Sequence, residues 1–323
     1  MPAGLPVVAE IVRSGFVEGH HYGSIVALAA DGSVGWSVGE VVAPVLPRSS
    51  NKPIQALAMV ELGLDLPDDL LALACASHSG EPFHVDGVRR TLASVGLDEA
   101  SLRTPADHPL DDAAREAVIR AGGTKSSILM NCSGKHAAML ATCVLRGWDT
   151  ATYLDVDHPL QVAIQETFER VTGEPATVAV DGCGAPLLSA SLTGLARAFA
   201  TLATATDGPA HRVAEAIRRH PEFVSGTTRD ELILHRAIPG LIGKAGAESV
   251  YAVALPDGRA WALKTDDGAP RVRPVLMAEA LRRSGVLEEV GVDAAAVAGT
   301  GRLQLLGGGV PVGEIRAAFQ LAP

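Results

Sequence analysis

The chain has 323 residues, 47% of them hydrophobic, and a formal net charge of −10. This length and hydrophobic content support a large buried core, and no apolar run is long enough to span a bilayer. The acidic balance argues against nucleic acid and anionic lipid as main partners, because both require a basic face. We therefore expect a globular protein that binds a small molecule, and neither nucleic acid nor a membrane.

The start of the chain and its cysteines indicate the compartment. Residues 1–5 lack the basic region and the long apolar stretch of a secretion signal. Four cysteines in a chain of this length do not form a secreted disulfide framework. We predict a cytoplasmic protein whose cysteines are core residues, metal ligands or reactive thiols.

Hairpins are predicted near both ends of the chain. Residues 24–28 and 34–38 flank the turn dipeptide Asp31-Gly32, and residues 249–255 and 260–263 flank Pro256-Asp257-Gly258. A further strand pair is expected over residues 303–306 and 310–312, which three glycines separate.

The middle of the chain is mostly helical in pattern. Apolar residues recur at helical spacing over 53–64, 137–145, 160–171 and 187–202. Shorter strand-like runs cover 41–46, 127–130 and 177–180. Because no flexible linker divides the chain, we predict one domain over residues 1–323. Its fold is α/β, with an antiparallel sheet from the N- and C-terminal strands packed with helices from the middle.

Ser49 and Lys52 have a spacing that suits acyl transfer. They lie three residues apart where a buried helix is expected to begin, so the lysine amine can reach the serine hydroxyl. A serine becomes a nucleophile when a neutral lysine takes its proton, and burial favours the neutral lysine. The alternative is that Ser49 or Ser50 only caps the helix and Lys52 is solvated.

Two further polar clusters follow apolar runs. Cys75-Ala76-Ser77-His78-Ser79-Gly80-Glu81 is typical of a site loop, although a plain polar turn fits equally. Asn131-Cys132-Ser133-Gly134-Lys135-His136 opens a buried helix and would direct backbone N–H groups at a carboxylate. The alternative for the second cluster is a helix cap with a structural glycine.

Two segments nearer the C-terminus could complete a site. Asp181 lies in a turn with two glycines and could bind an ammonium group, or it could belong to a simple turn. Lys244 could be a second cation of the site or a lysine that protects a sheet edge. From spacing alone a metal is not expected, since the chain has no Cys-x-x-Cys pair.

Together these segments resemble the asparaginase II family, which comprises the class 3 or rhizobial-type L-asparaginases. The matching motifs run in order through most of the chain: Arg48-Ser49-x-x-Lys52-Pro53, Cys75-Ala76-Ser77-His78, Asn131-Cys132-Ser133-Gly134-Lys135-His136, Asp157-His158-Pro159, Asp181-Gly182-Cys183, Gly243-Lys244 and Lys264-x-x-Asp267-Gly268.

The resemblance implies hydrolysis of L-asparagine to L-aspartate and ammonia. It also implies a fold similar to serine β-lactamases and glutaminases, and a homodimer. By matching motif, Ser49 would be the nucleophile and Lys52 its base, with Ser77 and Lys244 as the neighbouring pair.

The family also carries a metal, typically zinc, and the residues that match its ligands are Cys132, Lys135 and Cys183. A lysine ligand must be neutral to bind a metal, which a nearby dication makes possible.

We expect the substrate ammonium to bind Asp181 and the α-carboxylate to bind Arg48, Lys135 or His136. Two alternatives stay open at this point. One is a related Ser-Lys hydrolase that acts on glutamine or a β-lactam. The other is an amino-acid-binding protein without turnover.

Overall fold

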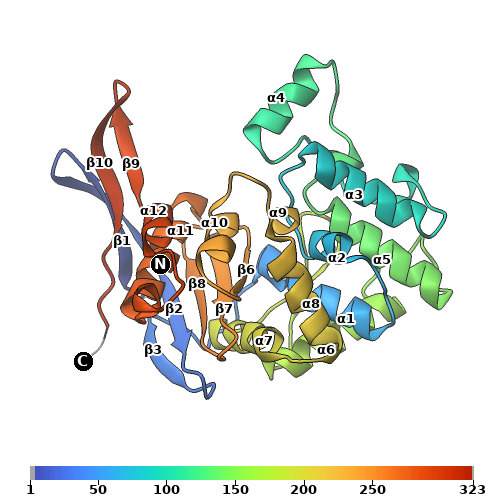
Figure 1. Ribbon diagram of the computed structural model, residues 1–323, viewed down its shortest axis with the longest axis horizontal. Coiled ribbons are helices and arrows are strands. Elements are labelled where there is room, and N and C mark those ends of the chain that lie inside the picture. The colour runs from blue at the N-terminus through green and yellow to red at the C-terminus, as the bar shows by residue number, and fades with distance from the viewer. Residues whose placement is uncertain (1–3, 322–323) are drawn as a thin grey trace. The chain divides into compact units, whose positions relative to one another are not determined.

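Strands from both ends of the chain form one antiparallel sheet in the computed structural model, which describes residues 4–321 (Figure 1). Its eight strands follow the order β6-β7-β8-β2-β1-β10-β9, and β3 also pairs with β2. Their bounds are β1 Val7–Arg13, β2 Phe16–Leu28, β3 Val34–Val38, β6 Ile242–Ala245, β7 Val250–Ala254, β8 Ala260–Thr265, β9 Leu303–Gly307 and β10 Val310–Ala317. In Figure 1 the blue N-terminal strands accordingly lie beside the red C-terminal ones.

The described chain divides into two compact units. The sheet unit comprises the chain up to Ser50, Ala190–Thr204 and the chain from Ile233 onward. The helical unit comprises Asn51–Ser189 and Ala205–Leu232. The single domain predicted over residues 1–323, whose ends lie outside the described residues, stays a prediction.

Helices cover both faces of the central sheet strands. They are α7 Leu192–Thr204, α10 Asp230–Ala237, α11 Arg273–Arg283 and α12 Ala294–Thr300, with short 3-10 turns at Pro270–Val272 and Val286–Glu288. Alternate residues such as Ile25, Tyr251 and Leu263 point into the core that α11 covers. The residues between them in register, Val26 and Ala262 among them, point the other way, and α7 packs against β7, β8 and β2.

The helical unit is built around α5, whose first eleven residues are all buried. Its helices are α1 Lys52–Glu61, α2 Asp68–Ala74, α3 Pro82–Ala93, α4 Asp112–Arg120, α5 Ser133–Arg146, α6 Pro159–Thr172, α8 Gly208–Arg219 and α9 Pro221–Val224. Short 3-10 turns cover Arg48–Asn51, at the junction with the sheet unit, Glu99–Ser101 and Ser127–Leu129. A two-stranded hairpin pairs β4 Val178–Val180 with β5 Pro186–Leu188.

The sequence-based fold class is confirmed: the protein is α/β, with an antiparallel sheet of terminal strands and helices from the middle. The three predicted hairpins form as β2–β3, β7–β8 and β9–β10. The predicted helices form as α1, α5 and α6, within a few residues of the expected bounds.

Three local predictions were wrong. Residues 127–129 form a 3-10 turn and not a strand. The helix predicted over 187–202 begins only at Leu192, because Pro186–Leu188 pairs with β4. Within 41–46 only Val45 makes a strand-like bridge, to Ala190. Apolar runs this short do not distinguish helix from strand.

In the described part of the chain, none of the helices combines the length and the apolar character that crossing a membrane requires.

We expect Gly134→Ala to destabilise the protein. A Cβ at Gly134 would lie 2.6 Å from the Leu73 carbonyl oxygen and 2.7 Å from Leu73 Cγ, where α5 meets α2. Such overpacking costs about 1–3 kcal/mol. Chemical denaturation of both variants measures the free energy of unfolding, with Gly299→Ala in exposed α12 as the control. No atom lies within 4 Å of a Cβ at Gly299, so this variant should be neutral or slightly more stable. Equal stability of the two variants would contradict the expected steric contact.

Candidate functional site

Lys52 is a buried cation at the start of α1, with 1% of its surface exposed. Its Nζ donates to the Ala76 carbonyl oxygen at 2.6 Å, to Ser77 Oγ at 2.9 Å and to Cys132 Sγ at 3.1 Å. These three acceptors replace the water that the ammonium group loses on burial. The predicted clusters around Ser77 and Cys132 are therefore brought together on one lysine.

The loop after α2 that carries Ser77 is held from two sides. The His78 backbone N–H donates to the Asn131 carbonyl oxygen at 3.0 Å, which joins this loop to the start of α5. On the other side, Arg229 donates to the Ser77 carbonyl oxygen at 2.7 Å and forms an ion pair with fully buried Glu231. The hydroxyl and the carbonyl of Ser77 are thus both fixed within the helical unit.

The sheet unit holds the other two predicted catalytic residues, Ser49 and Lys244. Ser49 is half-buried in the 3-10 turn Arg48–Asn51, which leads directly into α1. The neighbouring Ser50 is fully buried and donates through Oγ to the Lys244 carbonyl oxygen at 2.9 Å. Lys244, on β6, is also fully buried and donates through Nζ to the Ala245 carbonyl oxygen at 2.7 Å. Ser50 therefore ties the Ser49 turn to β6.

Arg48 lies in an unusual backbone conformation beside Ser49. Its φ is +51°, and its guanidinium lies 3.6 Å from the carboxylate of Glu248. Glu248 and Ser249 also have positive φ values, of +56° and +55°. Positive φ is uncommon for residues other than glycine and marks positions that the surrounding structure constrains.

Lys52 makes one contact that the sequence did not predict, a hydrogen bond to the hydroxyl of Ser77. The sequence paired Ser77 with Lys244 and Lys52 with Ser49. Ser49 and Lys244 belong to the sheet unit, and Lys52 and Ser77 to the helical unit. The two predicted pairs stay predictions.

Cys132 and Cys183, the predicted metal ligands, pack in one buried cluster with Met130 and Ala185. Cys183 lies at the tip of the β4–β5 hairpin, where Gly184 adopts a φ of +87° and lets the chain reverse. Lys135 Nζ donates to Cys183 Sγ at 3.2 Å, so the third predicted ligand reaches the same cluster.

Zinc binds cysteine thiolates, and the neutral form of a lysine amine offers a nitrogen lone pair as a third donor, so these residues fit the metal implied by the resemblance. Among residues 4–321 no group of three or more His, Cys, Asp and Glu side chains could hold a metal ion. Any site here therefore depends on the lysine as its third ligand.

Without a metal, the electrostatics of the cluster favour a Lys135 ammonium paired with a Cys183 thiolate. The hydrogen bond from Cys132 and the charge of Lys135 hold the pKa of Cys183 far below its usual range, although burial opposes this. Burial lowers the pKa of Lys135, but the neighbouring Cys183 and Cys132 raise it by more, so the net shift is upward. A metal at this position would have to displace the lysine proton.

The predicted substrate-binding residues have partners of their own. His136 Nδ1 lies 2.7 Å from the Tyr153 hydroxyl, and burial, followed by the charge of Lys135, lowers the pKa of His136 to about 4. The carboxylate of Asp181 lies 3.7 Å from Cys183 Sγ. Together with Arg48 and Lys135, their roles in substrate binding stay predictions.

Sequence analysis missed Arg229, Glu248 and Ser50. Arg229 is separated from Ser77 by 152 positions, and no local pattern reports so distant a hydrogen bond. The sequence indicates Ser50 only as a helix cap, because Ser49 is the serine that lies three residues before Lys52.

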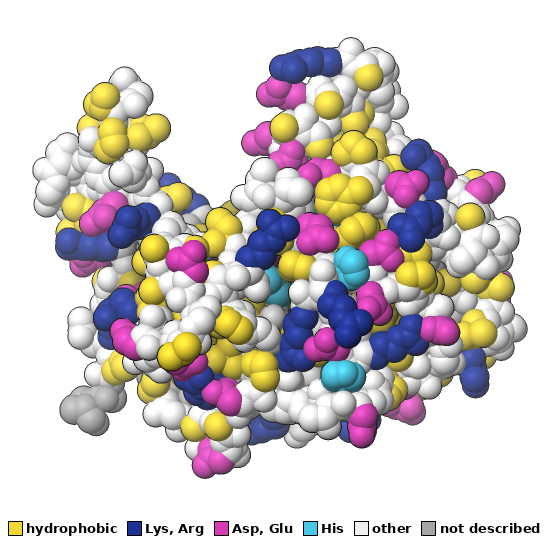
Figure 2. Space-filling view, in the orientation of Figure 1, with side chains coloured by type: hydrophobic (Ala, Val, Ile, Leu, Met, Phe, Trp, Pro, Cys, Tyr) yellow, Lys and Arg dark blue, Asp and Glu magenta, His cyan; other side chains and the backbone are white. Residues whose placement is uncertain are grey.

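The surface is mixed in charge. Figure 2 shows acidic and basic side chains interspersed over the face in view, as expected for an acidic chain with 27 Lys and Arg and 37 Asp and Glu residues.

Comparison with protein families gives a match over nearly the whole chain. A family model described as L-asparaginase II matches residues 9–317 of the chain. No curated protein matches this chain.

Solved structures are similar only at low identity. A β-lactamase from Mycobacterium bovis is 16% identical, with 81% of this chain and 94% of that chain covered and a TM-score of 0.38. The protein Mglu is 14% identical, with 86% of this chain covered and a TM-score of 0.41; this chain spans only 65% of its length. A hydrolase with promiscuous acyltransferase activity is 14% identical, with 80% and 93% covered and a TM-score of 0.42. We base no conclusion on these three likenesses, because each TM-score is below 0.5.

We expect the protein to lose stability as the pH falls from 6.5 towards 4. Burial lowers the pKa of His84, whose ring stacks on that of His78, to about 4. Between these pH values the unfolded chain binds a proton at His84 that the folded chain does not, which costs the folded state up to about 3 kcal/mol. The contribution of neutral His84 to the free energy of unfolding is fully present above pH 6.5.

Urea denaturation across this pH range tests the shift at His84. His84→Phe should reduce the pH dependence of the unfolding free energy by up to one proton, whereas His20→Gln on the exposed surface should leave it unchanged. An unchanged slope in His84→Phe would show that His84 is not held neutral by burial.

Proposed function

Because the chain belongs to the L-asparaginase II family, we propose that it hydrolyses the side-chain amide of L-asparagine to L-aspartate and ammonia through an acyl-enzyme on Ser49. Family membership supports a hydrolase. The observation that carries the proposed chemistry is the buried ammonium of Lys52, which lies three residues after Ser49 and binds the Ser77 hydroxyl.

Lys52 would act as the general base, and its surroundings suit this role. Of its three partners, the Ala76 carbonyl oxygen can only accept a hydrogen bond. The Ser77 hydroxyl and the Cys132 thiol can each accept or donate. When Lys52 is neutral, the Ser77 hydroxyl can donate a hydrogen bond to the amine in place of accepting one, so the neutral lysine keeps a partner in its buried position.

The reaction would proceed in two steps. The Ser49 oxygen bonds to the amide carbon of asparagine as Lys52 takes the hydroxyl proton, and the carbon–nitrogen bond then breaks as ammonia leaves with that proton. This gives a β-aspartyl ester on Ser49. Water, losing a proton to the same lysine, attacks the ester carbon, and the proton returns to the Ser49 oxygen as aspartate leaves.

The remaining residues would hold charge and orient the substrate. Ser77 and Lys244 would relay protons or stabilise the negative charge that develops on the amide oxygen. Asp181 would bind the substrate ammonium, and Arg48, Lys135 or His136 its α-carboxylate.

We also propose a zinc ion held by Cys132, Lys135 and Cys183. When bound, it would supply a positive charge beside Lys52, since Lys52 itself contacts Cys132 Sγ. The three side chains also position the start of α5 against the β4–β5 hairpin.

We further propose that the substrate is a small amino acid, and that the protein is a cytoplasmic homodimer. Glutamine or a β-lactam as substrate is the second candidate, since the same Ser-Lys chemistry opens either amide. Ammonia release from Asn and Gln, compared with nitrocefin turnover, separates these substrates. An amino-acid-binding protein would show binding of asparagine without ammonia release.

Ser49→Ala should lower kcat for ammonia release from asparagine on the order of 10³-fold or more, because no covalent ester can form. Ser50→Ala is the matched control: it removes the hydrogen bond to Lys244 and should cost about 1 kcal/mol of stability. It should still form the ester. Mass spectrometry of acid-quenched enzyme should find the aspartyl adduct on Ser49 in the wild type and in Ser50→Ala. An adduct on another residue, or near-normal turnover by Ser49→Ala, would show that Ser49 is not the nucleophile.

Cys132→Ser and Cys183→Ser should each purify with little zinc, because each removes one of two thiolate ligands. Elemental analysis of the purified protein gives the metal content per chain. Cys75→Ser is the control, since Cys75 is buried and its Sγ donates to the Leu71 carbonyl oxygen. A full zinc complement in both ligand variants would eliminate the proposed site.

A further inference from the structure

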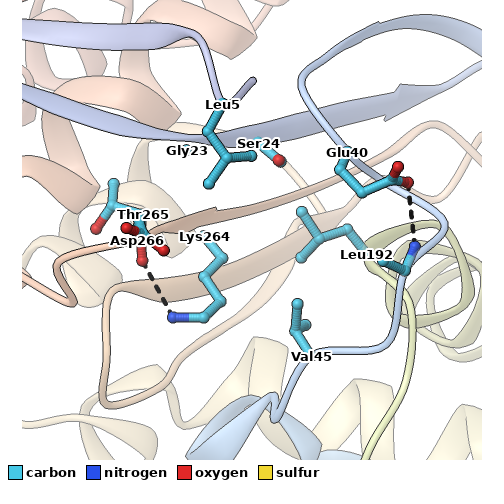
Figure 3. A pocket seen from close by; sticks show the side chains of 10 residues that line it. Leu5, Gly23, Ser24, Glu40, Val45, Leu192, Lys264, Thr265 and Asp266 are labelled. Atoms are coloured by element: carbon cyan, nitrogen blue, oxygen red, sulfur yellow. Dashed lines mark hydrogen bonds between the residues drawn. The ribbon is translucent and has the colours of Figure 1, made fainter. Parts of the chain in front are cut away.

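A cavity lies within the sheet unit, and no residue of the proposed catalytic set lines it (Figure 3). Its volume is about 230 Å³, which suits a molecule well below drug size. It opens between strands β2 and β8 and the beginning of α7, and Leu5, Val45 and Leu192 form its apolar wall. This is the face of the sheet that α7 covers.

Two polar groups of the cavity could bind the carboxylate of a ligand. Ser24 lines the cavity, is 5% exposed, and carries a hydroxyl that can donate a hydrogen bond. The half-buried ammonium of Lys264 donates to the carbonyl oxygens of Glu248, at 3.1 Å, and Thr265, at 3.0 Å. An ammonium has three donors, so one donor of Lys264 is left for a ligand. Burial lowers the pKa of Lys264.

The cavity also contains negative charge. The Glu40 carboxylate accepts hydrogen bonds from the backbone N–H groups of Val42, at 3.0 Å, and Ala43, at 3.2 Å, which hold it in place. Asp266 is a second acidic residue of the lining. In Figure 3 the Glu40 and Lys264 side chains lie on opposite sides of the apolar residues between them.

This arrangement matches a zwitterion. A simple carboxylate would bind Lys264 but face two like charges, and a simple amine would leave the donors of Lys264 and Ser24 unmatched. A zwitterionic amino acid pairs with both signs of charge, and an aliphatic side chain covers the apolar wall. We propose that this cavity is a regulatory site for a small aliphatic α-amino acid, whose carboxylate binds Lys264 and Ser24 and whose ammonium group binds Glu40.

Contacts within the sheet unit connect the cavity to the turn that carries Ser49. Lys264 binds the backbone of Glu248, and the Glu248 carboxylate lies 3.6 Å from Arg48, which precedes Ser49. A ligand carboxylate on Lys264 neutralises the cation that attracts Glu248, so Glu248 pairs more strongly with Arg48. Arg48 is then less available to the substrate carboxylate, and KM for asparagine rises. This effect on KM rests on the proposed function, whereas binding in the cavity does not.

Isothermal titration calorimetry with L-leucine tests the binding site directly. L-Leucine has no side-chain amide, so it cannot be turned over by amide hydrolysis. We expect saturable binding that weakens at least tenfold in Ala43→Leu, which fills the cavity, and severalfold in Ser24→Ala. Val42→Leu is the matched control, because Val42 is 70% exposed and does not line the cavity. 4-Methylpentanoate lacks the ammonium group and 3-methylbutylamine lacks the carboxylate, and each should bind at least tenfold more weakly than L-leucine.

Absence of saturable binding, or equal binding to the wild type and Ala43→Leu, would overturn the site. Equal affinity for L-leucine and either analogue would overturn its preference for a zwitterion.

The regulatory effect is measured as the KM for asparagine with and without saturating L-leucine. We expect at least a threefold increase in the wild type and in Val42→Leu, and no increase in Ala43→Leu. An increase that persists in Ala43→Leu would mean competition at the substrate site and would overturn the regulatory role, as would an unchanged KM in the wild type. Failure of the proposed function is recognised separately, as the absence of ammonia release and of an adduct on Ser49. The calorimetry then still decides whether the cavity binds amino acids.

Discussion

The helical unit is organised around one constraint, the burial of the Lys52 ammonium. A charge removed from water must be compensated by hydrogen bonds from the protein, and Lys52 obtains them from three groups in two separate segments. The loop that follows α2 and the first residue before α5 therefore have to meet at its Nζ. Arg229, which is half-buried, donates to the same loop from the other side, so the position of Ser77 depends on two cations.

Hydrogen bonds and an ion pair also link the proposed site residues to the rest of each unit. In the sheet unit, the Ser50 hydroxyl fixes the turn before α1 to the backbone of Lys244, and Arg48 faces Glu248 from a left-handed conformation. In the helical unit, Lys135 reaches Cys183 across 48 positions of sequence. Burying any of these polar or charged side chains without a partner would cost free energy. This accounts for the clustering of polar and charged residues in the motifs.

Local patterns were sufficient for much of the fold and for part of the site. Asp31-Gly32 and Pro256-Asp257-Gly258 specify hairpins by their own turn chemistry, and the apolar surroundings of Lys52 and Lys135 indicated that both helices are buried. Strand β1 was missed, because it is recognised only by its pairing with β2 and β10, and the latter lies some three hundred positions away. Arg229 was missed for the same reason. It donates to the carbonyl oxygen of Ser77 in a distant loop, and no periodicity in the sequence indicates such a contact.

The pairing of β1 with β10 has a consequence for how the protein acquires its structure. The register joins Ala9 to Ala317 and Arg13 to Gly313, so β1 cannot gain its second neighbour until some three hundred further residues have been synthesised. Loop closure over such a separation is slow and costs chain entropy, whereas the helices from Lys52 to Thr172 make contacts within their own segment. During translation one edge of β1 therefore stays unpaired until β10 is made, and this is the period in which aggregation or chaperone binding would act on the protein.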